Sequence, residues 1–202
     1  MRLEEGMAIL GLELPALAVQ KLHAYADLIE KWNRVYNLTA IQGKENIVSY
    51  HLLDSLVVLP HLEAKRCADV GSGAGLPGVV LAIARPDWDV VLVESNKKKA
   101  AFLRQTGIEL GLSNVEVMAE RVENLKENDF DLVISRAFSE MGEFARLAAP
   151  LCAKGGCLAA MKGRFPEKEI AELPSPVKVE KIIPLSVPGV EGERHLVIMK
   201  LE

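Results

Sequence analysis

The spacing of apolar residues divides the chain into two parts. Across Leu14–Tyr36 apolar residues recur every three or four positions, which places them on one face of an amphipathic helix, and Pro15 suits its first turn. A second helix is predicted over Glu45–Leu59, and Pro60 ends it. We therefore expect residues 1–62 to form an N-terminal helical cap and residues 63–202 to form the core, together making one compact unit.

Beyond the cap, short apolar runs alternate with helical stretches. Strands separated by helical patterns of about 10 to 15 residues indicate right-handed crossovers and a mainly parallel sheet covered by helices on both faces. The last two runs have only a Pro/Gly-containing loop between them, so they predict an antiparallel hairpin. The sequence thus predicts an α/β fold with a mainly parallel seven-stranded sheet. Its strands are expected at residues 67–71, 89–94, 114–119, 131–137, 157–162, 178–186 and 195–201, and its helices at 76–85, 97–110, 141–151 and 166–173.

Composition allows one domain with a substantial core, since half of the 202 residues are apolar. No apolar run approaches the roughly 18 to 20 residues that span a bilayer. The N-terminus carries acids where a secretory signal would carry bases, so we expect a cytoplasmic protein, and we expect a monomer. Cys67, Cys152 and Cys157 have neither zinc-ligand spacing nor an even number, so we expect reduced thiols and no metal.

The net charge of −4 gives no general attraction to nucleic acid, so a polyanionic partner would need a local basic face. Basic residues that could form such a face occur in three groups, although each alone is more often a solvated helix surface. The groups are Lys97–Lys99 with Arg104, Lys162 with Arg164, and Lys31 with Arg34.

The glycine-rich segment Asp69–Gly78 lies between a predicted strand and a predicted helix, the usual place of a ligand platform in such sheets. Glycines there permit positive φ and close approach of a ligand to the backbone. Read from Gly73, the segment matches the dinucleotide pattern G-x-G-x-x-G, but Pro77 would remove a donor near the pyrophosphate. Read from Asp69 as D-x-G-x-G-x-G, it places a carboxylate that suits an ammonium group. A purely structural role of the glycines is the remaining alternative.

The next two strands end in acidic residues. Glu94 lies nineteen positions after Gly75, a spacing that suits a carboxylate accepting both ribose hydroxyls of an adenosine. After the third strand, the side chain of Glu120 and neighbouring backbone groups are placed to meet an adenine edge. A solvated acid at a strand end is the alternative for both residues.

Several motifs together resemble one family. The segment DVGSGAGLPG, the triplet Asn37-Leu38-Thr39 within WNRVYNLTAI, the run His51–Ser55 and the sequence Ser135–Phe138 resemble the bacterial 16S ribosomal RNA guanine-N7 methyltransferase G family over nearly the whole chain. The resemblance implies a Rossmann-like class I methyltransferase fold. It also implies S-adenosylmethionine as donor, and as acceptor a guanine in the decoding region of 16S ribosomal RNA, free or in a small-subunit particle.

The resemblance also assigns site residues. Glycines of the loop would lie along the methionine and ribose of the donor, Glu94 would hold the ribose, and Ala119 with Glu120 would flank the adenine. The full predicted donor set is Asp69, Gly71, Ser72, Gly73, Gly75, Leu76, Glu94, Ser95, Ala119, Glu120, Arg121 and Arg136. The predicted acceptor set is Asn37, Thr39, Arg136, Phe138, Lys162 and Arg164.

Arg136 is the predicted catalytic residue, because an arginine at the end of a buried strand needs an anionic or aromatic partner. Its alternative is a salt bridge to an acid such as Glu140. Phe138 would stack on a flipped base or belong to the core. His51 and Asp54, one helical turn apart, would join cap to sheet rather than serve as metal ligands or an acid/base pair.

Guanine N7 has a free lone pair and loses no proton, so no general base is required. The segment 134–138 lacks the Pro-Pro tetrapeptide of amino-group methylation, and no Pro-Cys nucleophile is present, which favours a ring nitrogen. Three other readings remain: an enzyme of the same fold acting on a small molecule or protein, a dinucleotide-dependent oxidoreductase, and a non-catalytic RNA-binding assembly factor.

Overall fold

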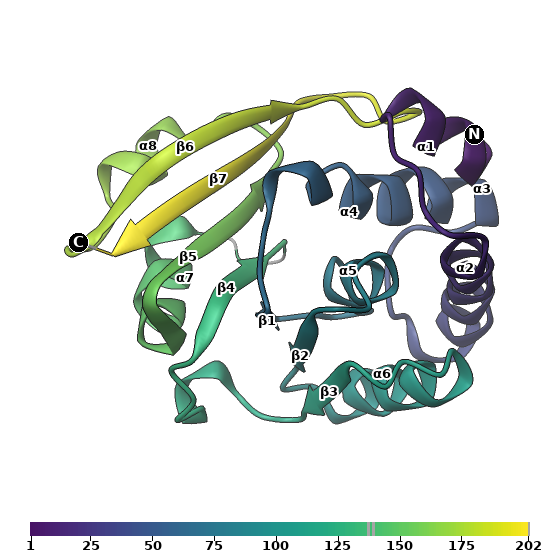
Figure 1. Cartoon of the computed structure of the whole chain (residues 1–202), viewed down its shortest axis with the longest axis horizontal. Coiled ribbons are helices and arrows are strands. Elements are labelled where there is room, and N and C mark those ends of the chain that lie inside the picture. Colours follow the sequence, from purple (N-terminus) through teal and green to yellow (C-terminus); the bar gives the residue numbers. More distant parts are fainter. Residues whose placement is uncertain (137, 139, 202) are drawn as a thin grey trace.

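The computed structural model describes residues 1–136, 138 and 140–201, and these form a mainly parallel seven-stranded sheet (Figure 1). The strand order is β3-β2-β1-β4-β5-β7-β6, and β7 runs antiparallel to both of its neighbours. The predicted sheet and C-terminal hairpin are therefore confirmed. The strands are β1 (Arg66–Val70), β2 (Asp89–Val93), β3 (Val115–Met118), β4 (Phe130–Ser135), β5 (Cys152–Lys162), β6 (Val177–Leu185) and β7 (Arg194–Leu201).

The predicted helices are present at nearly the predicted bounds, and two short helices of the described residues, α1 and η3, were not predicted. In the cap, η1 is a π-helical turn that continues α3 into α4. No helix in the part of the chain described is long and apolar enough to cross a bilayer. The helices are α1 (Leu3–Ile9), α2 (Ala16–Tyr36), α3 (Lys44–Ile47), η1 (Val48–Leu53), α4 (Asp54–Leu56), η2 (Leu59–His61), α5 (Gly78–Ala84), α6 (Lys97–Glu109), η3 (Val122–Asn124), α7 (Met141–Ala148), η4 (Ala149–Leu151) and α8 (Glu167–Ala171).

The sheet separates two hydrophobic clusters. Side chains alternate along β4, so Leu132 and Ile134 join the cluster under α2, α4, α5 and α6, whereas Val133 joins the cluster under α7 and α8. Figure 1 shows these two groups of helices on opposite sides of the strands. Burial on both faces explains why the central strands read as continuous apolar runs.

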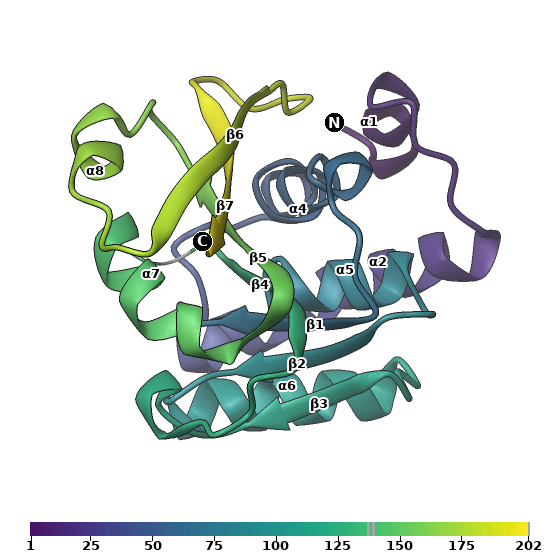
Figure 2. The ribbon, with the colours of Figure 1, turned by 60° about the vertical axis from the view of Figure 1, so that its left-hand side comes forward.

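The cap packs against the face that carries α5 and α6, and Figure 2 shows its helices α2 and α4 beside α5. Leu22 and Leu53 are fully buried in the same cluster as Val80 of α5. The buried phenol of Tyr25 donates a hydrogen bond to the carbonyl of Ala74, so α2 also touches the glycine-rich loop directly. Residues of the predicted cap and of the predicted core share one hydrophobic cluster. The boundary between a cap of residues 1–62 and a core of residues 63–202 remains a prediction.

Gly78 and Gly107 offer a matched test of this packing. A Cβ at Gly78 would lie 2.7 Å from Asp69 Oδ2 and overlap Leu92, whereas a Cβ at Gly107 would meet nothing within 4 Å. We expect Gly78→Ala to destabilise the protein by about 1–3 kcal/mol through overpacking. Gly107→Ala, inside α6, should stabilise it by up to about 1 kcal/mol through helix propensity. Chemical denaturation measures both, and equal effects of the two substitutions would contradict the described packing.

Candidate active site

The predicted ligand loop crosses the carboxyl ends of β1 and β2. The amides of Gly71 and Ser72 donate to the carbonyl of Val93 at 2.9 and 3.2 Å, which folds the loop over the end of β2. Gly71 and Gly73 have φ of +70° and +60°, the left-handed region that favours glycine. A Cβ at Gly73 would have no neighbour closer than 3.9 Å, so this part of the loop presents bare backbone to open space.

Gly75 has a different reason to be glycine. A Cβ there would lie 2.5 Å from Val79, 2.8 Å from Leu103 and 2.9 Å from the phenol oxygen of Tyr25. The structural explanation therefore applies to Gly75, while the open backbone at Gly73 suits a ligand. Ser72 and Leu76, also in the predicted donor set, are buried behind the loop.

Glu94 follows β2 and holds the loop in place. Its Oε2 accepts the amide of Gly73 at 2.8 Å, and its Oε1 accepts the amide of Asn96 at 2.7 Å. Each carboxylate oxygen has a further lone pair for a ribose hydroxyl. The sequence indicated the ribose role only, because a side-chain bond to the loop backbone leaves no trace in residue spacing.

A cavity of about 190 Å³ opens beside Glu94, and we call it the donor cavity. Five residues of the predicted donor set line it, from the ends of β1, β2 and β3. They are Gly71, Glu94, Ser95, Glu120 and Arg121. Phe138, which the sequence assigned to the acceptor, lines this cavity as well and contacts Phe144 with ring centroids 5.5 Å apart.

Asp69 lies fully buried below the loop. Its Oδ2 accepts the amide of Gly78 at 2.8 Å, and its Oδ1 has no hydrogen-bond partner among the described residues. Burial raises the pKa of this carboxyl to about 7, although the bond from Gly78 and the charge of Arg136 act in the opposite direction. Asp69 is not among the residues that line the donor cavity, so its predicted contact with an ammonium group remains a prediction.

A second and larger cavity, of about 390 Å³, lies where the cap meets the ends of β4 and β5 and the start of β7; we call it the acceptor cavity. Cationic, imidazole and apolar side chains make up most of its lining, and Asp54 is its acid. The lining residues are Ile41, Tyr50, His51, Asp54, Arg136, Met161, Lys162, Gly163, Leu185, Arg194 and His195.

Asp54 joins the walls of the acceptor cavity. Its Oδ2 pairs with Nη1 of Arg136 at 3.0 Å, and its Oδ1 pairs with Nε of Arg194 at 3.1 Å. Nη1 of Arg136 also donates to the carbonyl of Tyr50 at 3.2 Å. The acid that pairs with Arg136 is thus Asp54 of the cap rather than Glu140, and Asp54 links cap to sheet as the sequence predicted.

His51 has three polar neighbours, one of which is Nη2 of Arg136 at 3.4 Å from its Nδ1. Its Nε2 lies 2.8 Å from the hydroxyl of Thr39, and its Nδ1 lies 3.0 Å from the carbonyl of Tyr50. Burial and then the charge of Arg136 lower its pKa to about 4, so the ring is neutral near pH 7. Thr39, a predicted acceptor residue, does not itself line the acceptor cavity, but it contacts His51, which does.

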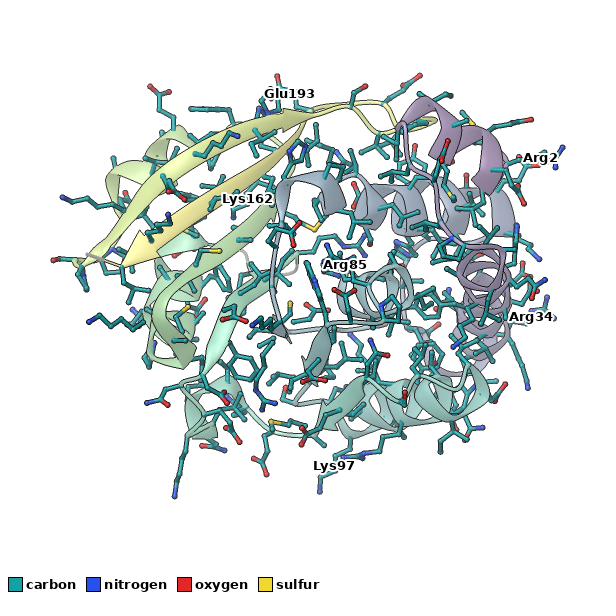
Figure 3. The ribbon with its side chains drawn as sticks, in the orientation of Figure 1. Arg2, Arg34, Arg85, Lys97, Lys162 and Glu193 are labelled. Atoms are coloured by element: carbon teal, nitrogen blue, oxygen red, sulfur yellow. The ribbon has the colours of Figure 1, made fainter. Side chains whose placement is uncertain are left out.

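Other predicted acceptor residues lie further from this cavity. Asn37 is exposed and ends α2 in a left-handed conformation, which is a capping role. Arg164 is exposed beyond Lys162, and Ala137 of the predicted motif lies outside the described residues. In Figure 3, Arg34 on α2, Lys97 on α6 and Lys162 on β5 lie well apart, so the three basic groups do not gather into one patch.

Arg194 and His195 line the acceptor cavity but were not among the predicted acceptor residues. Because β7 is antiparallel, its first residues lie at the same sheet edge as the last residues of β5, with His195 opposite Lys162. The predicted hairpin could have identified these two residues. In an antiparallel hairpin the second strand begins at the sheet edge where the parallel strands end, so its first residues lie beside the candidate site.

The fold assigns the chain to a known class. Its mainly parallel seven-stranded sheet superposes on solved methyltransferases. TrmN from Thermus thermophilus superposes with a TM-score of 0.59 at 19% identity, covering 84% of this chain and 53% of that one. A SAM-dependent methyltransferase from Aquifex aeolicus gives 0.58 at 19% identity, covering 75% and 91%. The fold is that of class I S-adenosylmethionine-dependent methyltransferases.

Sequence comparison identifies the family. The model of the family described as GidB, rRNA small subunit methyltransferase G, matches residues 18–197. Ribosomal RNA small subunit methyltransferase G of Nitrosospira multiformis is 53% identical, covering 98% of this chain and 96% of that protein. The protein of the same name from Chromobacterium violaceum is 52% identical, covering 99% and 97%. The chain belongs to the rRNA small subunit methyltransferase G family.

Membership confirms the fold class, the enzyme class and S-adenosylmethionine as donor that the sequence predicted. The roles of individual site residues remain predictions.

Gly73→Asp tests the donor loop. The substitution would place a carboxylate at the open backbone next to Glu94, so we expect it to weaken S-adenosylmethionine binding at least about hundredfold. Gly111→Asp is the matched control, because Gly111 also has a positive φ, +57°, and open space around it. Calorimetry measures affinity, and thermal melts should show similar stability losses in the two variants. Unchanged donor affinity in folded Gly73→Asp would contradict the assignment.

Asp69 and His51 should give stability opposite dependences on pH. Folded protein keeps the Asp69 proton up to about pH 7 while the unfolded chain loses it near 3.8, so this contribution is lost as pH rises through 7. The contribution of neutral His51 to stability is present above pH 6.5 and is lost as pH falls towards 4, because the unfolded chain takes up a proton more readily than the folded protein. Relative to the parent, Asp69→Asn should gain stability with rising pH and His51→Asn with falling pH. Thermal melts between about pH 4 and 7.5 test this; parallel curves for both variants would contradict it.

Proposed function

We propose that this protein transfers the methyl group of S-adenosylmethionine to N7 of a guanine in 16S ribosomal RNA. The observation that carries the proposal is an acceptor cavity lined by Arg136, Arg194 and Lys162, at the sheet edge where the donor loop also lies. It occurs in a chain whose relatives are named ribosomal RNA small subunit methyltransferase G.

The donor cavity suits S-adenosylmethionine, which when bound supplies a methyl group on a sulfonium. Glu94 offers carboxylate oxygens to the ribose hydroxyls, and Glu120 lies at the end of β3 to meet the adenine edge. Bare backbone at Gly73 allows close approach of the ligand.

The acceptor cavity suits a base that has left its stack. Ile41, Met161 and Leu185 give it apolar walls for a planar ring, while the guanidinium groups provide donors at one side. Arg136 can donate to O6 of a guanine through Nη2 while Nη1 stays on Asp54, which leaves N7 free. Because N7 releases no proton, the neutral His51 needs no role as a base and serves to position the wall.

Asp54 is the acid of the acceptor cavity, and its carboxylate pairs with both Arg136 and Arg194. Cationic side chains therefore outnumber acidic ones in the lining, which suits the phosphates of an RNA strand. We further propose that the protein works as a cytoplasmic monomer, on free 16S ribosomal RNA or on the small-subunit particle.

Methyl incorporation into 16S ribosomal RNA from cells that lack the enzyme tests the function and the role of Arg136. We expect Arg136→Ala to lose about ten- to hundredfold in rate at saturating donor, the effect of about 1.5–3 kcal/mol of charged hydrogen bonding. Arg136→Lys should lose nearly as much, because the planar fork is gone. Arg146→Ala removes an exposed arginine of α7 that lines neither cavity and is the control.

Two outcomes would contradict the proposal. No transfer to RNA by the parent, with transfer to a small-molecule or protein fraction, would favour the alternative substrates. Donor binding without any transfer would favour a non-catalytic assembly factor. Near-normal turnover of Arg136→Ala, or a loss explained by unfolding in a thermal melt, would return Arg136 to a structural role.

A further inference from the structure

A third cavity lies in the cap, on the other side of the chain segment around Ile41 that lines the acceptor cavity. We call it the cap groove; its volume is about 210 Å³. Ile41 lines both the cap groove and the acceptor cavity, so the two are separated by a single stretch of chain. The groove is lined by Glu30, Asn33, Arg34, Ile41, Gln42, Gly43 and Ile47.

The wall between the two cavities is held rigidly. Asn33 of α2 accepts the amide of Thr39 at 2.9 Å and donates to the carbonyl of Ile41 at 3.2 Å. The hydroxyl of Thr39 accepts the amide of Ile41 at 3.1 Å and meets His51 on the acceptor side. The same side chains therefore fix both surfaces of the wall, without any contribution from a ligand.

Two polar side chains of the groove are free. The side chains of Arg34 and Gln42 are exposed and make no hydrogen bond or ion pair with the described residues, although the backbone carbonyl of Gln42 accepts from Asn46 at 2.9 Å. Glu30 is the carboxylate of the lining, so the groove carries one charge of each sign and no excess of acid. A free guanidinium recognises a phosphate, and a free carboxamide pairs with the edge of a base.

The geometry points to a second nucleotide site: we propose that the cap groove binds a nucleotide that flanks the target guanine in the RNA chain. Arg34 contacts its phosphate, Gln42 reads its base edge, and the half-buried Ile41 supports the ring. This inference rests on the proposed function, because the strand that enters the acceptor cavity continues past Ile41. The groove volume is several times the roughly 30 Å³ that one water occupies, which leaves room for a planar ring.

Arg34→Gln and Lys31→Gln form a matched pair that separates local binding from general charge. Lys31 is exposed on the same helix, three residues before Arg34, and does not line the groove. Both variants remove one positive charge, so long-range attraction would weaken equally in both. We expect Arg34→Gln to raise Kd for the RNA substrate about tenfold and to lower its salt slope by about one. Lys31→Gln should change Kd less than about twofold, and donor affinity should be unchanged in both.

Abasic RNA tests the base contact. Substrates with a single abasic nucleotide within two positions of the target on either side are compared on the parent and on Gln42→Ala. At one of these positions the abasic change should weaken binding to the parent but not to Gln42→Ala. Equal effects of Arg34→Gln and Lys31→Gln, or equal sensitivity of parent and Gln42→Ala to every abasic position, would overturn the inference. A parent that transfers no methyl group to RNA would instead contradict the proposed function, and the inference with it.

Discussion

The buried carboxylate of Asp54 is the contact on which the acceptor side of this protein depends. Its side chain is 7% exposed and it pairs with Arg136 and Arg194. These three residues come from the cap, from the end of a parallel strand and from the start of an antiparallel strand. Removing one partner of a buried ion pair lowers the free energy of unfolding by about 3–5 kcal/mol. This carboxylate therefore holds three distant parts of the chain together around one cavity.

The donor side is built in a similar way, by an acid that bonds to backbone. Glu94 accepts amides of Gly73 and Asn96, which ties the loop after β1 to the loop after β2. Tyr25 of the cap donates to Ala74 on the far side of the same loop. The cap thus touches the donor loop through Tyr25 and lines the acceptor cavity through Asp54, so it contributes to both parts of the candidate site.

Hydrophobic spacing was sufficient to predict the fold and to bring several predicted donor residues to one edge of the sheet. Strands buried on both faces must be apolar throughout, and helices that cover them must be amphipathic, so the order of elements was readable from hydrophobic spacing. The short α1 escaped because Leu3–Ile9 is too brief to show a helical period. The donor residues were predictable for a related reason: parallel strands all end at one edge, so residues such as Gly71, Glu94 and Glu120 had to meet there.

Only the tertiary structure decided the acceptor half. Asp54 and Arg136 lie 82 positions apart, and Asp54 and Arg194 lie 140 apart, distances over which residue spacing carries no information about contact. Phe138 was predicted to stack on a flipped base or to belong to the core, and it lines the donor cavity instead of the acceptor cavity. Periodicity fixes which face of an element is buried. Which side chains of different elements meet is set by how the cap and the hairpin pack on the sheet, because that packing brings side chains from separate elements within hydrogen-bond reach.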